Sequence, residues 1–323
     1  LALSPDGRWL AVGGWAHNEC GDRCGEIRLY EFATGRLVAL LKGHTNVVSA
    51  LAFSRDGTRL ISGSADSTAI LWDVNTRALV HHLRGHTDYI YAIAFTPDGK
   101  RAVTGSYDAT LRLWSVTDGR AIATMAHQAS VRVLAVSQTS GIIAAGDFDG
   151  EIRLWDGTSG QLVRTLGKQR GRVGAIAFDQ TGKRLITTCG GGLPCSDIPQ
   201  TVWDVSTGKE LAYYRGHRSL VLAAAARPDS RFLAATGDFN GEIHLWDGST
   251  GSRDRVLRGT GVSAWSVGFS ADGKQLAWGN TYRYLASNDR APLEFQIRLP
   301  DVSQTLGRPE RLARAQSIGT AGF

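Results

Sequence analysis

A tryptophan returns at an almost constant interval through most of this 323-residue chain. It precedes Asp at Trp72, Trp155, Trp203 and Trp246, and it precedes Ser at Trp114. Successive tryptophans lie 42, 41, 48 and 43 residues apart. Because repeated units stack on one another and share one continuous core, this period predicts a single repeat domain, although the length alone would allow two or three domains.

A short polar turn follows the first apolar segment of each unit. Its Pro presets φ, and its Asp and Gly accept the tight conformations that follow, so the turn has a clear physical basis. The seven copies are Ser4–Gly7, Ser54–Gly57, Thr96–Gly99, Ser137–Gly141, Asp179–Gly182, Arg227–Ser230 and Ser270–Gly273. Together with 39 glycines against 8 prolines and 1 methionine, they predict seven units of short strands and tight turns.

Gly-His near the start of a unit and Trp-Asp near its end, as in Gly43-His44 and Trp72-Asp73, resemble the WD40-repeat family. The resemblance covers nearly the whole chain. It implies an all-β fold, a seven-bladed β-propeller of four-stranded antiparallel blades in a single domain over residues 1–323. The expected repeats are 1–42, 43–84, 85–125, 126–167, 168–215, 216–258 and 259–316.

The two ends of the chain complement each other. Residues 1–3 match only the end of a first strand, whereas residues 317–323 match a complete one. We therefore expect residues 317–323 to form the inner strand of the first blade, beside residues 8–41. Closure of this kind removes exposed strand edges. The alternative is that the chain is excised from a longer array and that Phe323 begins an eighth unit.

Side chains with the composition of a hydrolase triad recur along the chain. A catalytic nucleophile is needed once, whereas a hydrogen-bonded set that ties strands together is needed in every blade, and buried polar groups must satisfy one another. We therefore interpret them as structural, as the WD40 resemblance also implies. The sets are His44, Ser62, Asp66 and Trp72; His86, Thr104, Asp108 and Trp114; His127, Asp149 and Trp155; and His217, Thr236, Asn240 and Trp246.

Two units keep this pattern only in part, and the first and seventh units have lost most of it. The fourth unit has Ala145 where the hydroxyl is expected, and the fifth has Gln169 where the His is expected. Asp147 and Asp238, which are equivalent to each other, are interpreted as turn formers only. We expect no metal site and no cofactor.

All four cysteines lie in two enlarged loops, Cys20 and Cys24 within residues 13–25, and Cys189 and Cys195 within residues 188–197. Two local disulfides are one interpretation, and they would imply an oxidising compartment. Free thiols in a reducing cytosol are a second. A metal site that uses His17, Cys20 and Cys24 is a third, but it lacks a visible fourth ligand.

The resemblance implies that the Gly-His loops and the acidic turns lie on one face, around the mouth of a central channel, where partners commonly dock. Tyr, Trp and Arg dominate interface hot spots because they combine a large contact area with a polar group. The alternatives are that Phe148 and Phe239 pack locally and that Tyr91 and Trp265 fill gaps in the ring. The expected rim residues are Tyr89, Tyr91, Arg132, Arg172, Trp265, Tyr107, Phe148 and Phe239.

The charges restrict the kinds of partner. The 36 basic and 30 acidic residues are spread along the chain, so we expect a mixed surface that does not bind nucleic acid. No apolar run approaches the roughly 18 residues that a bilayer span requires, so no membrane insertion is expected. We expect a monomeric domain, either alone or as part of a longer chain.

Two function classes remain. The first is a noncatalytic scaffold that binds a protein or a peptide on the rim face. The second is a propeller enzyme or small-molecule binder that uses the channel mouth, because fold alone does not decide function. The scaffold is favoured because no cluster of His, Asp or Glu stands outside the repeated positions.

Overall fold

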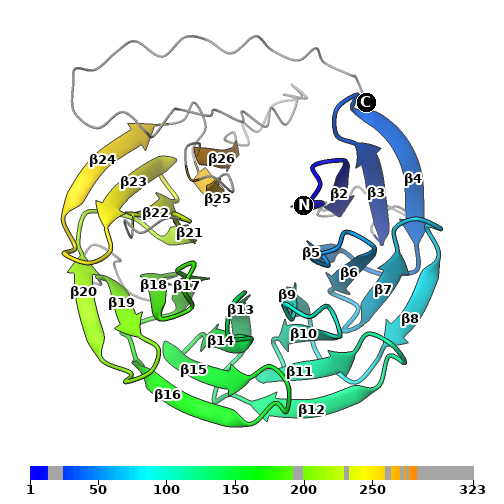
Figure 1. Ribbon diagram of the computed structural model, residues 1–323, viewed down its shortest axis with the longest axis horizontal. Coiled ribbons are helices and arrows are strands. Elements are labelled where there is room, and N and C mark those ends of the chain that lie inside the picture. The colour runs from blue at the N-terminus through cyan, green and yellow to red at the C-terminus, as the bar shows by residue number, and fades with distance from the viewer. Residues whose placement is uncertain are drawn as a thin grey trace.

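The computed structural model describes residues 1–13, 25–191, 199–228, 233–258, 263–269, 273 and 276–281. Within them, β-strands are the only regular secondary structure. Within each sheet, every strand pairs antiparallel with the next along the chain, and the sheets follow one another around a ring (Figure 1). The predicted all-β propeller class is confirmed.

The first three sheets contain four strands each. They are β1 (Ala2–Leu3), β2 (Trp9–Gly13), β3 (Glu26–Glu31) and β4 (Arg36–Lys42); β5 (Val48–Phe53), β6 (Arg59–Ser64), β7 (Ala69–Asp73) and β8 (Leu79–Leu83); and β9 (Ile90–Phe95), β10 (Arg101–Ser106), β11 (Thr110–Ser115) and β12 (Ala121–Ala126).

Three further four-stranded sheets and one pair of strands follow. They are β13 (Val131–Val136), β14 (Ile142–Asp147), β15 (Glu151–Asp156) and β16 (Leu162–Lys168); β17 (Val173–Phe178), β18 (Arg184–Cys189), β19 (Gln200–Asp204) and β20 (Glu210–Tyr214); β21 (Val221–Ala226), β22 (Leu233–Asp238), β23 (Glu242–Asp247) and β24 (Arg253–Arg258); and β25 (Ser263–Phe269) with β26 (Leu276–Thr281).

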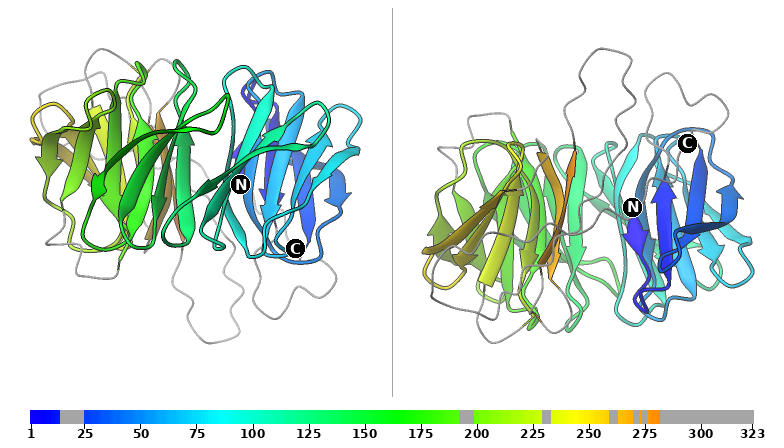
Figure 2. Two further views of the ribbon diagram at one scale, coloured as in Figure 1. Left: turned by 90° about the horizontal axis from the view of Figure 1, so that it is seen from below. Right: turned by 90° about the horizontal axis from the view of Figure 1, so that it is seen from above.

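The first strand of each sheet lies at the centre of the ring and contacts the first strand of the next sheet. Seen from the side, the sheets stand next to one another with their strands roughly along the ring axis (Figure 2). Burial follows this arrangement. The second strand, such as β10, is buried along almost its whole length because sheets cover both its faces, whereas the outer strand β12 is largely exposed.

The recurring tryptophans lie on the third strands and fill the spaces between sheets. Trp72 packs with Ile27, Leu29 and Leu41 of the preceding sheet in one buried cluster. Trp114, Trp155, Trp203 and Trp246 likewise each share a cluster with residues of the sheet before them. The period in the sequence is therefore the period of the contacts between sheets.

Sheets approach most closely at a glycine near the end of the second strand. A Cβ on Gly63 would lie 2.6 Å from Ile90 Cγ2, and a Cβ on Gly146 would lie 2.6 Å from the side chain of Val173. Contacts this short leave no room for a side chain. The first strand of the following sheet can therefore pack there only against bare backbone.

The first sheet shows how far ring closure can be described. Its inner strand is β1, which pairs Ala2 with Ala11 and Leu3 with Leu10. Leu3 and Ala2 thus occupy part of the inner position that we expected residues 317–323 to fill. Those residues lie outside the described part of the chain, as does most of the seventh unit. The number of blades, the division into seven repeats and the closing strand stay predictions.

Replacing Gly146 by Ala should lower the free energy of unfolding by about 1–3 kcal/mol, because the new methyl group must displace Val173 in a packed contact. Denaturant unfolding monitored by tryptophan fluorescence measures the change. Gly268→Ala on β25 is the matched control, because a Cβ there meets no atom within 4 Å. Equal stability of Gly146→Ala and Gly268→Ala would contradict the proposed close contact.

Candidate functional site

The segment before the first strand and the turn after the second strand lie at the same end of each sheet. Backbone hydrogen bonds join them directly, from the Tyr107 N–H to the Tyr89 carbonyl at 2.9 Å and from the Phe148 N–H to the Ser130 carbonyl at 3.0 Å. The Phe239 N–H makes the equivalent bond to the Leu220 carbonyl at 2.8 Å. We call the end of the disc that these turns form the top face.

Five of the expected rim residues touch one another across the third, fourth and fifth sheets. The Tyr91 and Tyr107 rings stack with centroids 4.5 Å apart, and Tyr89 stacks on Tyr107 at 6.3 Å. The Phe148 ring meets Tyr107 edge-on at 5.3 Å, and the Arg172 guanidinium lies 4.6 Å from the Phe148 centroid. We call these residues the aromatic-arginine cluster.

The outer members of the aromatic-arginine cluster are exposed to solvent, and its central rings are half-buried. Tyr89 is 42% exposed and Arg172 is exposed, whereas Tyr91, Tyr107 and Phe148 are half-buried. Burial raises the pKa of the Tyr107 hydroxyl, and the adjacent Tyr91 adds to this shift. Tyr107 therefore stays neutral and able to donate a hydrogen bond. The local-packing interpretation of Phe148 and its role as a rim residue are compatible, because the ring packs on Tyr107 and still reaches the surface.

A second aromatic pair lies on the sixth and seventh sheets. Phe239 and Trp265 meet edge-on with centroids 6.3 Å apart, and they are 46% and 42% exposed. Phe239 is therefore not held in a closed local core. Trp265 also lines the hollow between the inner strands. Its expected role in partner binding stays a prediction.

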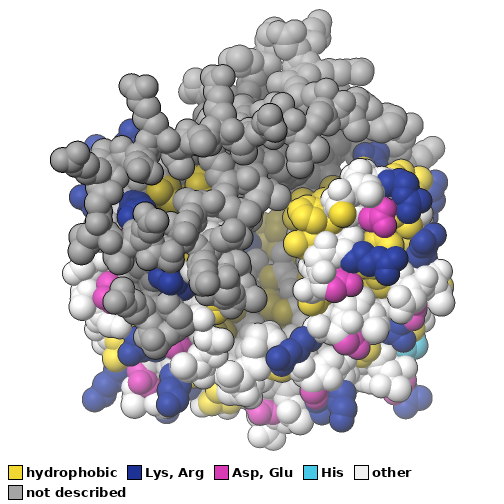
Figure 3. All heavy atoms as spheres, turned by 45° about the horizontal axis from the view of Figure 1, so that its top comes forward, with side chains coloured by type: hydrophobic (Ala, Val, Ile, Leu, Met, Phe, Trp, Pro, Cys, Tyr) yellow, Lys and Arg dark blue, Asp and Glu magenta, His cyan; other side chains and the backbone are white. Residues whose placement is uncertain are grey.

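The channel contains a hollow of about 390 Å³ lined by Leu1, which precedes β1, and by the inner strands of the six sheets that follow the first. Tyr91, Arg132 and Trp265 are the large side chains among its lining residues. Figure 3 shows hydrophobic side chains on the inner wall, while basic and acidic side chains are intermixed over the outer surface. The intermixing agrees with the spread of charges along the sequence.

The triad-like sets of the second and third sheets are closed hydrogen-bonded networks. Ser62 Oγ lies 2.8 Å from His44 Nε2 and accepts the Trp72 indole N–H at 2.9 Å, and Asp66 lies 2.9 Å from His44 Nδ1. His86, Thr104, Asp108 and Trp114 repeat this geometry at 2.7–2.9 Å. Both hydroxyl residues are fully buried, so neither can reach a substrate.

The acid of the fourth and sixth sheets is not the one that the motif spacing predicts. His127 Nδ1 lies 3.3 Å from Asp147, not Asp149, and His217 Nδ1 lies 2.9 Å from Asp238, not Asn240. In these two sheets the carboxylate that meets the His comes from the last residue of the second strand, two positions before the one that the motif predicts.

In the second sheet two side chains accept the backbone N–H groups of the turn. Ser64 accepts the Asp66 N–H, and Asp66 accepts the Thr68 N–H. In the fourth sheet Asp147 accepts the N–H groups of both Asp149 and Glu151. Asp147 and Asp238 are therefore turn formers and network acids at once.

The fourth network is incomplete. Ala145 is fully buried where the other sheets place a hydroxyl, and both His127 Nε2 and Trp155 Nε1 are buried without a hydrogen-bond partner among the described residues. The sixth network is complete, since Thr236 lies 2.7 Å from His217 Nε2 and accepts the Trp246 N–H at 3.3 Å.

In the fifth sheet Thr187 accepts the Trp203 N–H at 2.9 Å. Gln169 donates to the carbonyls of Arg172 and Thr188, so it anchors the loop that carries Arg172.

Cys189 ends β18 and is buried and disulfide-bonded. Cys20, Cys24 and Cys195 lie outside the described residues, as does His17. The pairing of Cys189 with Cys195 stays a prediction.

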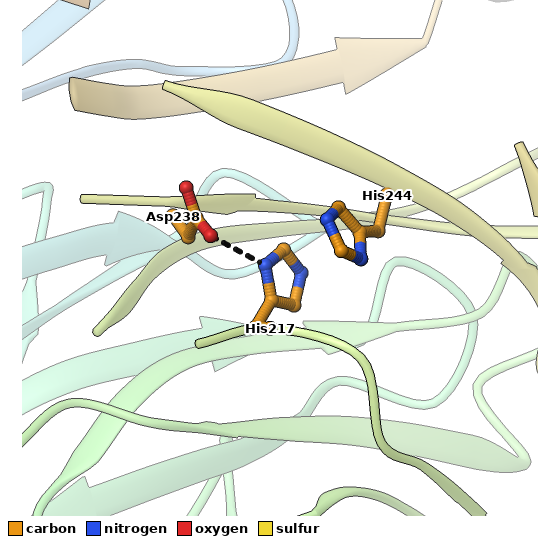
Figure 4. Close-up of side chains that lie close together, drawn as sticks. All are labelled: His217, Asp238 and His244. Atoms are coloured by element: carbon orange, nitrogen blue, oxygen red, sulfur yellow. Dashed lines mark hydrogen bonds and ion pairs between the residues drawn. The ribbon is translucent and has the colours of Figure 1, made fainter. Parts of the chain in front are cut away.

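Two groups of side chains bring possible metal ligands within 4.8 Å of one another in the described part of the chain. They are the buried His217, Asp238 and His244, and the buried His127 and Asp147 with the half-buried Glu151. Sequence reasoning missed the first group because His244 stands outside the repeated positions. Figure 4 shows the His217 and His244 rings face to face, with centroids 3.8 Å apart and planes at 22°. A ring nitrogen binds a metal in the plane of its ring, so stacked rings do not aim at a shared ion.

The ring nitrogens of this pair also have partners already. His217 lies between Asp238 and Thr236, and His244 lies 2.6 Å from the Tyr214 hydroxyl and 3.1 Å from Glu242. Burial, helped by the neighbouring His217, lowers the pKa of His244 and keeps it neutral. The group is part of a hydrogen-bonded network that joins the sixth sheet to Tyr214 of the fifth.

Comparison with known proteins identifies the repeats. Residues 35–73, 77–115, 119–156 and 208–247 match the family model of the WD domain, G-beta repeat (WD40). The chain is 40% identical over 72 residues to the intraflagellar transport protein 122 homolog of Danio rerio, which is 22% of this chain and 5% of that protein. It is 38% identical over 76 residues to the target of rapamycin complex subunit wat1 of Schizosaccharomyces pombe, which is 23% and 21% of the two chains.

The matched regions thus span only a small part of these relatives. Among solved structures, the computationally designed Ika8 protein superposes with a TM-score of 0.68 and 28% identity, over 79% of this chain and 75% of that one. Across the described residues, no helix is long and apolar enough to cross a membrane.

Replacing Ala145 by Ser should raise the free energy of unfolding by about 1 kcal/mol, because one hydroxyl can serve both His127 Nε2 and Trp155 Nε1. Thermal and denaturant unfolding measure the gain. Ala144→Ser is the matched control, since Ala144 is equally buried but belongs to the cluster around Trp203, where an unpaired hydroxyl should destabilise. Loss of stability in Ala145→Ser would refute the assignment of the orphaned pair.

The networks should also make stability depend on pH. Burial raises the pKa of Asp66, but hydrogen bonds from His44, Thr68 and the Thr45 N–H outweigh it and hold the pKa well below the ordinary 3.8. A carboxylate with a depressed folded pKa stabilises the fold above its unfolded pKa and loses this effect as the pH falls through the folded value.

Asp66→Asn should therefore cost about 1–3 kcal/mol at pH 7, and its deficit relative to wild type should shrink below pH about 4. Unfolding curves between pH 7 and pH 3 measure the deficit. Gly146→Ala, which changes no titrating group, should keep a constant deficit over the same range. A constant deficit for Asp66→Asn as well would exclude the network as the source of the pH dependence.

Proposed function

Because this chain belongs to the WD40-repeat family, we propose that it is a noncatalytic scaffold that binds a protein or peptide segment through the top face of its propeller. The observation that carries the proposal is the aromatic-arginine cluster. It crosses three sheets, so the fold holds its rings in fixed relative positions before any partner arrives. Pre-ordered aromatic and arginine side chains lose little conformational entropy on binding.

The composition of the cluster fits the recognition of a peptide. Its rings offer flat apolar contact, the tyrosine hydroxyls offer hydrogen bonds, and the Arg172 guanidinium offers paired donors for a carbonyl or carboxylate. Arg132 and Trp265 extend the same chemistry into the channel mouth. A partner segment that crosses from Tyr89 toward the channel would meet apolar and polar contacts in turn.

Other observations agree with a noncatalytic role. The side chains that look like a triad are buried and engaged with one another, and the same arrangement recurs in several sheets. By its name, the wat1 relative is a subunit of a larger complex, which is the setting in which a scaffold acts.

The test is a selection of peptides from a random display library on the wild-type chain, followed by affinity measurement on variants. Tyr89→Ala combined with Arg172→Ala should weaken the selected peptides by about thirtyfold or more, the scale of hot-spot residues. Both side chains are exposed, so the melting temperature should stay close to that of wild type.

Tyr213→Ala is the matched control, because Tyr213 is 49% exposed on the outer strand β20, away from the top-face turns. Peptides that bind the double variant as tightly as wild type, or that lose as much affinity in Tyr213→Ala, would place binding elsewhere on the molecule.

A further inference from the structure

A hollow of about 460 Å³ is lined by the two outer strands of the sixth sheet and by the loop that leads into this sheet, and it shares no residue with the aromatic-arginine cluster. Arg218 contributes to it from the loop before β21, Glu242 and His244 from β23, and Arg253 and Arg258 from β24. Three guanidinium groups from two segments of the chain therefore line one small space.

Strand register explains why these side chains share one face. Arg258 pairs with Glu242, Val256 with His244 and, past a bulge, Arg253 with Trp246. Directly paired residues point to the same side of a sheet. That side is turned toward the fifth sheet, because the Trp246 ring stacks on Tyr214 of β20 with centroids 5.2 Å apart.

The inner end of the hollow is fixed by Tyr214 and His244, whose hydroxyl and Nδ1 lie 2.6 Å apart. Gly216 closes over them, and a Cβ at Gly216 would lie 2.1 Å from the Tyr214 hydroxyl. A larger residue is therefore excluded there.

A comparison with the fourth sheet shows why the space is open. Glu151–Trp155 and Glu242–Trp246 differ in sequence only at Arg153 and His244. Arg153 extends across the corresponding region and donates to the carbonyl of Ala126 at 2.7 Å. The shorter His244 turns toward Tyr214 instead. One substitution thus replaces a side chain that spans the gap with one that does not.

The charges that line the hollow do not cancel. One oxygen of Glu242 accepts from Arg258 at 2.8–2.9 Å, and the other meets His244. Arg253 lies beside the Tyr214 hydroxyl. Arg218 is exposed and forms no ion pair with any residue that the structure describes. Against the single carboxylate, the three arginines leave an excess of two positive charges around the hollow.

We propose that this hollow binds a phosphate monoester through Arg218, Arg253 and Arg258. A monoester is close to a dianion at neutral pH, which matches the excess charge. Its tetrahedral oxygens accept several N–H groups at once, and the forked guanidinium is suited to such acceptors. The site lies outside the aromatic-arginine cluster and does not depend on the function proposed for it.

The test is isothermal titration of inorganic phosphate into the whole chain, with chloride at the same ionic strength as the reference. Each guanidinium should contribute about tenfold or more in affinity, so Arg218→Gln combined with Arg253→Gln should weaken binding about a hundredfold. Arg255→Gln is the matched control, because Arg255 is exposed on the same strand but pairs with Leu245 and points to the opposite side of the sheet. Its affinity should equal that of wild type.

Two outcomes would overturn the proposal. One is a wild-type titration with no heat beyond that of chloride. The other is an equal loss in Arg255→Gln and in the double variant, which would reduce the effect to general surface charge.

The source of the phosphate is distinguished by two further titrations, with free O-phosphoserine and with a short phosphoserine peptide. Equal affinity for the two, with loss in the double variant, supports a small phosphorylated molecule. Tighter binding of the peptide, absent for its unphosphorylated form, supports a phosphorylated chain segment.

Discussion

Burial of the third-strand tryptophan between successive sheets is the interaction on which the rest of this structure depends. Trp72, Trp114 and Trp246 are the largest fully buried side chains among the described residues, but each indole also carries one N–H that cannot be buried alone without a cost of about 1–3 kcal/mol. A Ser or Thr hydroxyl on the second strand meets this need. In the second, third and sixth sheets this hydroxyl is itself bonded to the His, whose other ring nitrogen meets the Asp. Packing between sheets and hydrogen bonding within a sheet are thus joined at one atom, the hydroxyl oxygen. The fourth sheet, which lacks that atom, shows the same packing with two polar groups unsatisfied.

The all-β propeller class and the structural role of most hydrogen-bonded sets could be predicted from the sequence, because a pattern that recurs in several units is more informative than a single copy. A single Ser, His and Asp could belong to an enzyme, but recurrence of the set in the second and third sheets, and in altered form in the fourth and sixth, favours a structural role. The same reasoning failed where a copy departs from the others. The motif spacing pointed to Asp149 and Asn240, although an amide at Asn240 could not replace a carboxylate, and Asp238 two residues earlier was the signal to use. Spacing along the chain does not report which of two nearby acids turns inward.

The two candidate sites differ in how visible they are in sequence. The aromatic-arginine cluster was predictable residue by residue, because each member occupies a repeated position at a strand end. Its contacts were not, since stacking of Tyr91 on Tyr107 depends on side-chain angles that no pattern encodes. The basic hollow was not predictable at all. It arises because His244 stands where the fourth sheet has the longer Arg153, and because Arg218 and Arg253, 35 residues apart in the sequence, both line the hollow.

The relocated acid of the fourth and sixth sheets has a consequence for how the top face can change. In the second and third sheets the residue six positions before the tryptophan is fixed by its histidine. In the fourth and sixth sheets the His is bonded to Asp147 and Asp238 instead. The side chains of Asp149 and Asn240 therefore take no part in the network. These two top-face positions stand beside Phe148 and Phe239. A substitution at either position therefore leaves the His–Asp hydrogen bond of its sheet in place, whereas the equivalent change in the second or third sheet removes that bond.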